Sequence, residues 1–351
     1  MPYMSEDKIA SIVERVVARL KDGEPRVSLR TVAAEVSPQF GCPPMGRSRA
    51  SEAETRPRFA GPSAVRVGSR GVFSDMDQAV EAARQAFLRL STLGLEARYR
   101  IIAEMRKEAH RHVDTMSKAA VDETGLGRVD QKVIKNRLVI DKTPGPEWLT
   151  PWAQSGDDGL TIEEYAPFGV IAAITPTTNP TETVICNAIG MMAAGNSVVF
   201  NPHPGAKKVS AYCVQILNDA IVRAGGPENL VACMAEPTIE SAQKLMRHPG
   251  VRLLVVTGGP GVVKEAMNAG KKVIAAGPGN PPVVVDETAD LDTAADGIVK
   301  GVGLDNNIVC TAEKEIMAVA AITDELKRLM ARHGAYELSP AEAEKLVKVV
   351  V

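Results

Sequence analysis

The chain has 351 residues, which is enough for two or three domains around a large buried core. Its apolar fraction of 45% and its charged fraction of 24% are those of an ordinary globular protein, and its formal net charge is only −2. A nearly neutral chain in which 4% of the residues are aromatic does not favour binding to nucleic acid or to an anionic membrane. We therefore expect neither of these partners.

The cysteines and histidines show no pattern of a metal site or of a disulfide framework. None of the five cysteines forms a CxxC pair, and the five histidines form neither an HxxxH nor an HExxH motif. No apolar run approaches the roughly 18 residues of a membrane span, and the N-terminus lacks the apolar core of a secretory signal. The sequence predicts a cytoplasmic protein without a bound metal.

The first twenty residues carry a single apolar stripe. Ser5 can cap a helix, and apolar side chains then recur with helical spacing at Ile9, Ile12, Val13, Val16, Val17 and Leu20. Residues 21–62 lose this periodicity and are rich in Gly, Pro and charged residues, a composition that cannot bury enough apolar surface to fold. We predict an amphipathic helix over residues 1–20, joined to the body by a flexible linker over residues 21–62.

The globular body is predicted to begin near residue 63 with two long amphipathic helices, at residues 75–90 and 95–119. A stretch punctuated by Gly and Pro follows, and residues 148–168 are predicted to form a hairpin around the polar turn Ser155–Gly159. Short β-branched runs then alternate with helical segments. The predicted strands are 169–175, 197–200, 230–234, 251–257 and 273–276, and the predicted helices are 181–194, 207–224, 239–247 and 260–269. This alternation predicts an α/β fold with a doubly wound parallel sheet.

Ligands on such sheets bind beyond the carboxyl ends of the strands, and three polar loops follow predicted strands. They are Thr175–Pro180, Asn201–Gly205 and Thr257–Gly261. The third loop is rich in Gly and opens a helix, so its backbone N–H groups can bind a phosphate. It lacks the third glycine of a dinucleotide fingerprint, and the pattern alone also fits an ordinary tight turn.

One cysteine stands out by its surroundings. Cys186 and Cys213 lie within apolar helical runs and Cys233 ends a strand-like run, which predicts three buried and inert thiols. Cys42 lies in the predicted linker. Cys310 follows a polar stretch rich in Gly and Asn and is the best candidate for an accessible thiolate, although a lone cysteine is more often structural.

Five segments in order resemble the CoA-acylating branch of the aldehyde dehydrogenase superfamily. They are ITPTTNP (174–180), NPHP (201–204), VTGGPGVVKEAM (256–267), AAGPGNPPVVVDETAD (275–290) and LDNNIVCTAEKE (304–315), and ETGLGRVDQKVIKN (123–136) fits the same group. The closest resemblance is to the propionaldehyde and acetaldehyde dehydrogenases of bacterial microcompartments, and it runs from about Gly71 to the end of the chain.

The resemblance implies an aldehyde dehydrogenase fold with three parts. An NAD- and CoA-binding domain would span residues 63–285 and would include an oligomerisation hairpin at about 148–168. Residues 286–351 would form an incomplete α/β catalytic domain that carries the nucleophile, because chains of this family continue well past Val351. The final run, residues 341–351, is expected to be helical and ends in three valines.

The family mechanism can be carried over residue by residue. Cys310 matches the nucleophile that attacks the aldehyde and becomes a thioester after hydride transfer to NAD, and CoA then takes the acyl group. Asn179 matches the side-chain amide that stabilises the oxyanion together with the backbone N–H of Cys310. Contacts to the cofactors are implied at Thr175, Pro176, Thr177, Asn201, His203, Thr257, Gly258, Gly259, Gly277 and Pro278. His203 lies between two prolines, so its ring could instead only fill a turn.

Two departures from the hydrolytic aldehyde dehydrogenases bear on the product. Ala276 stands where those enzymes carry a glutamate base, and water is a poor nucleophile without a base, whereas the thiol of CoA is a strong one. Asn201 replaces a lysine that contacts the adenosine ribose, so Asn201 or His203 is expected to make that contact. Acyl transfer to CoA is therefore favoured over hydrolysis.

The resemblance implies a homo-oligomer in the lumen of a bacterial microcompartment, where residues 5–20 would dock on a shell protein. An ordinary terminal helix packed on its own domain is the alternative for this segment. Two alternatives for the function also remain open at this point: a hydrolytic aldehyde dehydrogenase, and a truncated non-catalytic fragment that binds a nucleotide or docks on a shell. CoA dependence separates the first from the leading prediction, and turnover separates the second.

Overall fold

The computed structural model describes residues 65–68 and 70–350. The chain divides into two units, Met1–Pro57 and Arg58–Val351, and every feature described below belongs to the second. The predicted terminal helix (1–20) and linker (21–62) lie outside the described residues. Within the described part, no helix is long and apolar enough to cross a membrane.

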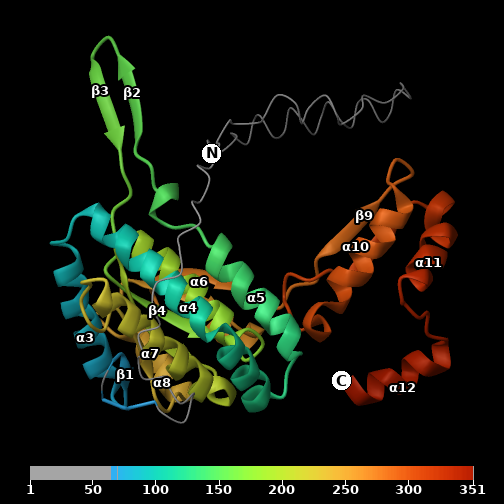
Figure 1. The fold of residues 1–351 in the computed structure, drawn as a ribbon, viewed down its shortest axis with the longest axis horizontal. Helices are drawn as coiled ribbons and strands as arrows, with labels where there is room; N and C mark the ends of the chain where they lie inside the picture. Colours follow the sequence, from blue (N-terminus) through green and yellow to red (C-terminus); the bar gives the residue numbers. More distant parts are fainter. Residues whose placement is uncertain (1–64, 69, 351) are drawn as a thin grey trace, which may run out of the picture. The chain divides into compact units, whose positions relative to one another are not determined.

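A six-stranded parallel sheet forms the centre of this unit (Figure 1). Its strands lie in the order β1-β6-β5-β4-β7-β8. Their bounds are β1 (Val72–Phe73), β4 (Val170–Thr175), β5 (Ser197–Pro202), β6 (Val231–Met234), β7 (Leu253–Thr257) and β8 (Lys272–Ala276). From β4 the chain moves outward to β5 and β6, then returns to the other side of β4 for β7 and β8. This doubly wound arrangement confirms the predicted fold class.

The helices cover both faces of the sheet. They are α3 (Met76–Leu90), α4 (Leu95–Thr124), α5 (Val129–Lys142), α6 (Pro180–Ala193), α7 (Lys207–Arg223), α8 (Ile239–Arg247) and α9 (Pro260–Met267). Side chains of α4, α6 and α7 form one apolar cluster with the sheet, and side chains of α3, α8 and α9 form another. Because both faces of β4 are covered, all six of its residues are buried.

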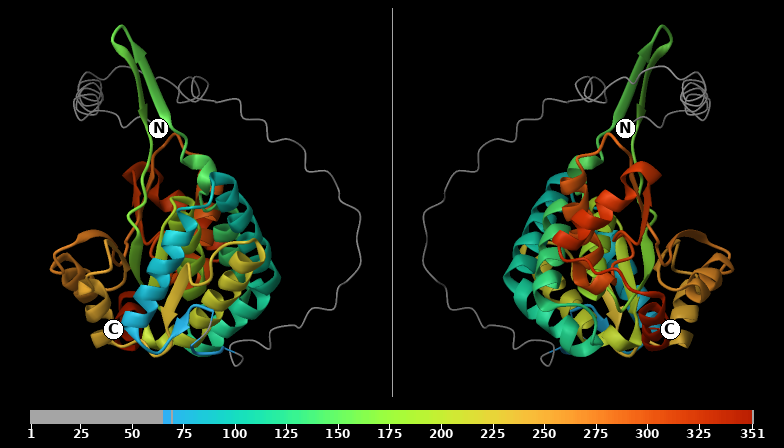
Figure 2. Two further views of the ribbon diagram at one scale, coloured as in Figure 1. Left: turned by 90° about the vertical axis from the view of Figure 1, so that its left-hand side faces the viewer. Right: turned by 90° about the vertical axis from the view of Figure 1, so that its right-hand side faces the viewer.

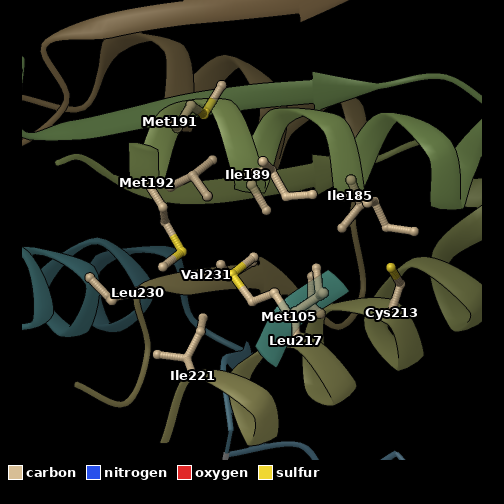
Figure 3. Close-up of a cluster of buried hydrophobic side chains, with 14 of the residues drawn as sticks. Met105, Ile185, Ile189, Met191, Met192, Cys213, Leu217, Ile221, Leu230 and Val231 are labelled. Atoms are coloured by element: carbon tan, nitrogen blue, oxygen red, sulfur yellow. The ribbon is translucent and has the colours of Figure 1, made fainter. Parts of the chain in front are cut away.

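The first cluster is shown in Figure 3, where Met105 of α4, Ile189 of α6 and Leu217 of α7 approach one another. One strand, β4, contributes side chains to both clusters, because successive side chains of a strand point to opposite faces of the sheet. Ile171 therefore packs in the first cluster and Ala172 in the second. A strand buried on both faces reads as a continuous apolar run, which is why β4 can be predicted from sequence.

The helices differ from the prediction most clearly in α4 and α5. Helix α4 continues five residues beyond the predicted end and stops at Gly125, whose φ of 67° is the left-handed conformation of a helix C-cap. Helix α5 was not predicted at all. The glycines and prolines that suggested a loop lie on either side of it, and the segment Val129–Lys142 itself contains neither residue type.

The predicted hairpin is present. Strands β2 (Trp152–Gly156) and β3 (Gly159–Glu163) pair in antiparallel fashion, and Asp157 and Asp158 form the turn between them. Every residue of both strands is exposed, and the ribbon stands out from the layered sheet and helices (Figures 1 and 2). Its predicted role in oligomerisation remains a prediction.

A second, smaller core follows the sheet. Strand β9 (Pro282–Val285) pairs in parallel with β10 (Glu315–Ala318), and α10 (Leu291–Gly303) and α11 (Thr323–Arg332) pack against each other. Its buried apolar side chains are Val285, Ala295, Ile298, Ile322, Leu326 and Leu329. The last element is α12 (Pro340–Val350), which agrees with the predicted helical run. The assignment of residues 286–351 to a catalytic domain remains a prediction.

Candidate active site

A cavity of about 820 Å³ lies at the carboxyl ends of β4, β5, β7 and β8. The cavity lies at the point where the strand order reverses. The chain continues from β4 to β5 and β6 on one side of the sheet, and later to β7 and β8 on the other side of β4. Such a switch point is the usual ligand site of a doubly wound sheet. The volume is within the range of about 300–1,000 Å³ that is typical of small-molecule sites.

All twelve residues that the sequence predicts for the site line this one cavity. They are Cys310, Asn179, Thr175, Pro176, Thr177, Asn201, His203, Thr257, Gly258, Gly259, Gly277 and Pro278. Cys310 comes from the chain segment between α10 and β10, and the other predicted residues lie at the carboxyl ends of strands of the sheet or directly after them. The chemical roles assigned to these residues remain predictions.

The last residue of β4 and the loop after it bring two polar side chains to the cavity. Thr175 is buried, and its hydroxyl oxygen has no hydrogen-bond partner among the described residues, so a ligand can supply one. Asn179 occupies the N-cap position of α6, yet its side chain does not cap that helix. Its Oδ1 instead accepts a hydrogen bond from Lys135 Nζ at 2.6 Å, and its Nδ2 donates to Thr178 Oγ1 at 3.1 Å.

The C-terminal end of β5 and the residues after it hold Asn201 and His203 in different environments; Asn201 was predicted to lie in the loop but belongs to the strand. Asn201 is buried, donates to the carbonyl oxygen of Thr238 at 3.4 Å and accepts from Ser241 Oγ at 2.6 Å, so its amide fixes the start of α8. His203 is exposed at the cavity, and its Nδ1 accepts a hydrogen bond from the backbone N–H of Gly205 at 3.1 Å. The ring therefore does stabilise a turn, as the alternative reading of the sequence proposed, while it also lines the cavity.

The loop after β7 presents the N-terminus of α9. Gly258 N–H donates to the carbonyl oxygen of Ala276 in β8 at 3.1 Å, which fixes the loop against its neighbouring strand. Gly259 is the N-cap residue, and a Cβ at this position would meet no atom within 4 Å, so the backbone here faces open space. A helix N-terminus that is open to a cavity suits an anionic group.

The segment that carries Cys310 has an unusual backbone. Asp305, Asn306 and Asn307 have φ values of 51°, 56° and 59°, three successive residues in the left-handed region that Asp and Asn tolerate better than most residue types. Asn307 Nδ2 donates to the carbonyl oxygen of Val302 at 2.8 Å and to that of Glu313 at 3.1 Å. These bonds hold a tight loop on which Cys310 is half-buried.

The other thiols have different surroundings. Cys213 and Cys233 are buried, as predicted, and burial raises the pKa of both thiols. The prediction for Cys186 was wrong, because its side chain is exposed and lines a separate groove together with Trp148 and Met191. Helix α6 is apolar nearly all round, so its sequence does not reveal which residues face outward.

Sequence reasoning missed a buried charged cluster beside the cavity. Lys132 and Lys135 of α5 form ion pairs with Asp305, and Lys135 also lies 3.3 Å from Glu182 of α6. All four residues are buried. The only signal in the sequence was two lysines three residues apart, which share one face of a helix, but the helix itself was not predicted.

The charges of this cluster compensate one another. Burial alone would raise the pKa of the Asp305 carboxyl, but hydrogen bonds from Lys135 and the Arg128 N–H, together with the charges of Lys135 and Lys132, hold that pKa below its usual value. Burial lowers the pKa of Lys132, an effect that the carboxylates of Glu182 and Asp305 oppose. Asp305 is thus held as a carboxylate that ties the Cys310 segment to α5.

The cavity residues fit a dinucleotide. The open Gly258–Gly259 loop at the start of α9 suits its phosphates, and the unpartnered hydroxyl of Thr175 offers a polar contact. Among residues 65–68 and 70–350, no group of three or more His, Cys, Asp or Glu side chains could hold a metal ion.

Comparison with known proteins places the chain in a family. The profile of the aldehyde dehydrogenase family matches residues 68–339. The acetaldehyde dehydrogenase (acetylating) EutE of Salmonella typhimurium is 51% identical over 286 residues, which are 81% of this chain and 61% of that protein. The chain thus spans about three fifths of the length of this relative.

Solved structures give the same result. A propionaldehyde dehydrogenase of Rhodopseudomonas palustris, with bound CoA and an acylated cysteine, superposes with a TM-score of 0.78 at 52% identity and covers 81% of this chain and 65% of that one. A propionaldehyde dehydrogenase from the fucose utilisation bacterial microcompartment of Clostridium phytofermentans superposes with a TM-score of 0.77 at 49% identity and covers 80% and 65%. The chain belongs to the aldehyde dehydrogenase family.

Proposed function

We propose that the protein oxidises a short-chain aldehyde to an acyl-CoA with NAD, through a thioester on Cys310. The observation that carries this proposal is that Cys310, Asn179 and the open N-terminus of α9 line one cavity. The similar proteins named above are acetaldehyde and propionaldehyde dehydrogenases, and the structure of one of them contains bound CoA and an acylated cysteine. We propose substrates of the same size for this chain.

In the proposed reaction, the thiolate of Cys310 attacks the aldehyde carbon and an oxyanion forms on the former carbonyl oxygen. Nδ2 of Asn179 and the backbone N–H of Cys310 donate hydrogen bonds to this oxyanion. The oxyanion then collapses to a thioester as the hydrogen on the former aldehyde carbon leaves as hydride, and a dinucleotide held by Thr175, Gly258 and Gly259 would accept that hydride. The thiolate of CoA then attacks the thioester carbon, a second oxyanion forms at the same place, and the bond to Cys310 Sγ breaks to release acyl-CoA.

The fate of the thioester depends on which nucleophile can reach it in ionised form. Ala276 ends β8 and provides no general base that could activate water. CoA needs no such base, because a thiol is partly ionised near neutral pH and is intrinsically a strong nucleophile. We therefore propose acyl transfer to CoA and not hydrolysis.

The proposal is tested by following NADH absorbance with propionaldehyde and NAD, in the presence and absence of CoA. Sustained NADH formation is expected only with CoA, and the product should be propionyl-CoA. Equal turnover without CoA, with propionate as the product, would instead establish the hydrolytic alternative. A chain that forms no NADH under either condition would be the non-catalytic alternative.

Gly279 offers a separate test of the geometry around the nucleophile. A Cβ at Gly279 would collide with the backbone carbonyl of Cys310, and a backbone group cannot swing aside as a flexible side chain can. Gly279→Ala should therefore displace the nucleophile and lower the rate of acyl-CoA formation by about 10²-fold. Gly297→Ala in α10 is the matched control, because its Cβ meets open space, and its rate should equal that of the unmodified chain.

We also propose that the protein is a homo-oligomer and the cargo of a bacterial microcompartment, with residues 5–20 docking on a shell protein. The support is the apolar stripe of that segment and the microcompartment origin of a similar protein. Purified shell proteins should retain the full chain in a sedimentation assay and should not retain a chain that lacks residues 1–20. Equal retention of both would count against this proposal.

A further inference from the structure

Lys135 connects the two loops that carry the proposed catalytic groups. Its side chain is buried, and its ammonium group contacts three oxygen atoms, two of them from the N-terminal end of α6 and one from the segment before Cys310. Nζ lies 2.6 Å from Asn179 Oδ1 and 3.3 Å from Glu182 Oε1, and it forms an ion pair with Asp305 Oδ2. The contact with Asn179 is a hydrogen bond, in which the ammonium group donates, and the contacts with Glu182 and Asp305 are ion pairs.

The contact with Lys135 fixes which atom of the Asn179 amide faces which way. A lysine ammonium only donates hydrogen bonds, so the amide atom next to it must be the acceptor, Oδ1. The amide nitrogen is then on the other side of the group. One N–H of Nδ2 is directed to Thr178 Oγ1, and the second is left for the cavity that Asn179 lines.

A competing position for the amide exists in the same structure. Asn179 is the N-cap residue of α6, and an asparagine in that position normally turns its Oδ1 back to the N–H groups of the first helical turn. In this protein the side chain makes no such bond. Oδ1 of Asn179, which could otherwise cap α6, accepts its hydrogen bond from Lys135.

The same ammonium also links Asn179 to the segment that carries Cys310. Asp305 lies five residues before Cys310, and it accepts hydrogen bonds from the Arg128 N–H at 2.8 Å and from Lys132 at 3.3 Å, besides its ion pair with Lys135. The two lysines and the carboxylates of Asp305 and Glu182 balance in charge, which a buried cluster requires.

We infer that Lys135 is a positioning residue that holds the Asn179 amide with Nδ2 toward the oxyanion formed at Cys310. This inference rests on the proposed function and deepens it. Without the ammonium, the amide is free to rotate into the N-cap of α6, and the oxyanion loses a donor although both Asn179 and Cys310 are still present.

The test uses acyl transfer from propionyl-CoA to the full chain, followed as the mass of the protein after rapid quenching. In this step Cys310 Sγ forms a bond to the thioester carbon, an oxyanion forms and collapses, and CoA leaves as its thiolate, so no oxidant is needed. Lys135→Met should lower the rate of acylation by about 10²-fold, close to the effect of removing one oxyanion donor. Lys142→Met on the exposed end of the same helix is the control and should leave the rate unchanged.

A double-variant cycle separates positioning from a general structural role. If Lys135 acts through Asn179, then Lys135→Met should cause no further loss in a chain that already carries Asn179→Ala. A further tenfold loss in the double variant, or a Lys135→Met chain that reacts at the unmodified rate, would overturn the inference and leave the proposed function intact.

Two other results are also decisive. Should Lys135→Met not fold, Lys135→Arg is used in the same cycle, where a smaller loss with the same cancellation is expected and additive losses overturn the inference. An unmodified chain that forms no adduct on Cys310 would overturn the proposed function, and the inference with it.

Discussion

Cys310→Ala is expected to abolish acyl-CoA formation and lower the rate by at least about 10⁴-fold, because removal of a covalent nucleophile leaves only binding and electrostatic effects. None of the remaining thiols whose surroundings are described lines the cavity: Cys213 and Cys233 are buried, and Cys186 lies in a separate groove. The rate is measured as CoA-dependent NADH formation with propionaldehyde.

Cys186→Ala is the matched control for this variant, since it removes an exposed thiol outside the cavity. It should retain the rate of the unmodified chain. If Cys310→Ala keeps more than about one tenth of that rate, Cys310 is not the nucleophile. A large loss in Cys186→Ala would indicate that the groove beside Trp148 takes part in the reaction.

Asn179→Ala is expected to lower kcat by about 10²–10³-fold with little change in the KM for NAD, since the lost hydrogen bond exists only while an oxyanion is present. The side chain does not cap α6, so its removal leaves the start of that helix unchanged, although Lys135 loses one acceptor. The measurement is steady-state NADH formation over a range of NAD and propionaldehyde concentrations.

Asn187→Ala supplies the comparison, because it removes the same group from the same helix at a position in the separate groove. Its kcat should be that of the unmodified chain. A variant at Asn179 that raises KM for NAD and leaves kcat alone would show that this amide binds the cofactor and does not stabilise an oxyanion.

Five of the six strands of the sheet, β4 to β8, could be predicted because each is determined by local sequence, whereas the two-residue β1 was not predicted. β4 is a run of apolar residues buried on both faces, and the loop after β7 combines glycines with the start of a helix. Ligands of parallel sheets bind at the carboxyl ends of the strands. Because Thr175, Asn201 and Thr257 were each expected at such an end, they were predicted to lie together in one cavity. The resemblance to a family added Cys310 and Asn179.

What could not be predicted depends on contacts between distant parts of the chain. Lys135 meets Asn179 from 44 residues away, and Arg128 meets Asp305 from 177 residues away. No periodicity or local motif encodes such a pairing, and α5 itself was hidden by the glycines around it. The exposure of Cys186 was missed for another reason, since an apolar helix does not reveal its outward face.

One consequence of this pairing is that the two proposed catalytic loops are not independent. The segment before Cys310 is held to α5 through Asp305, and the loop before α6 is held to α5 through Lys135 and through Lys132, which donates to the Thr178 carbonyl oxygen at 3.0 Å. Helix α5 thereby serves as a common support for both groups. A change in its buried face should affect nucleophile and oxyanion donor together.

The most direct test of the account is the mass of the intact, unmodified chain after incubation with propionyl-CoA, followed by mapping of the modified peptide. The proposed chemistry predicts the addition of one propionyl group, located on Cys310 and removed again by an excess of free CoA. A chain that stays unmodified, or one that carries the acyl group on another residue, would contradict the assignment of Cys310 as an acyl-transferring nucleophile.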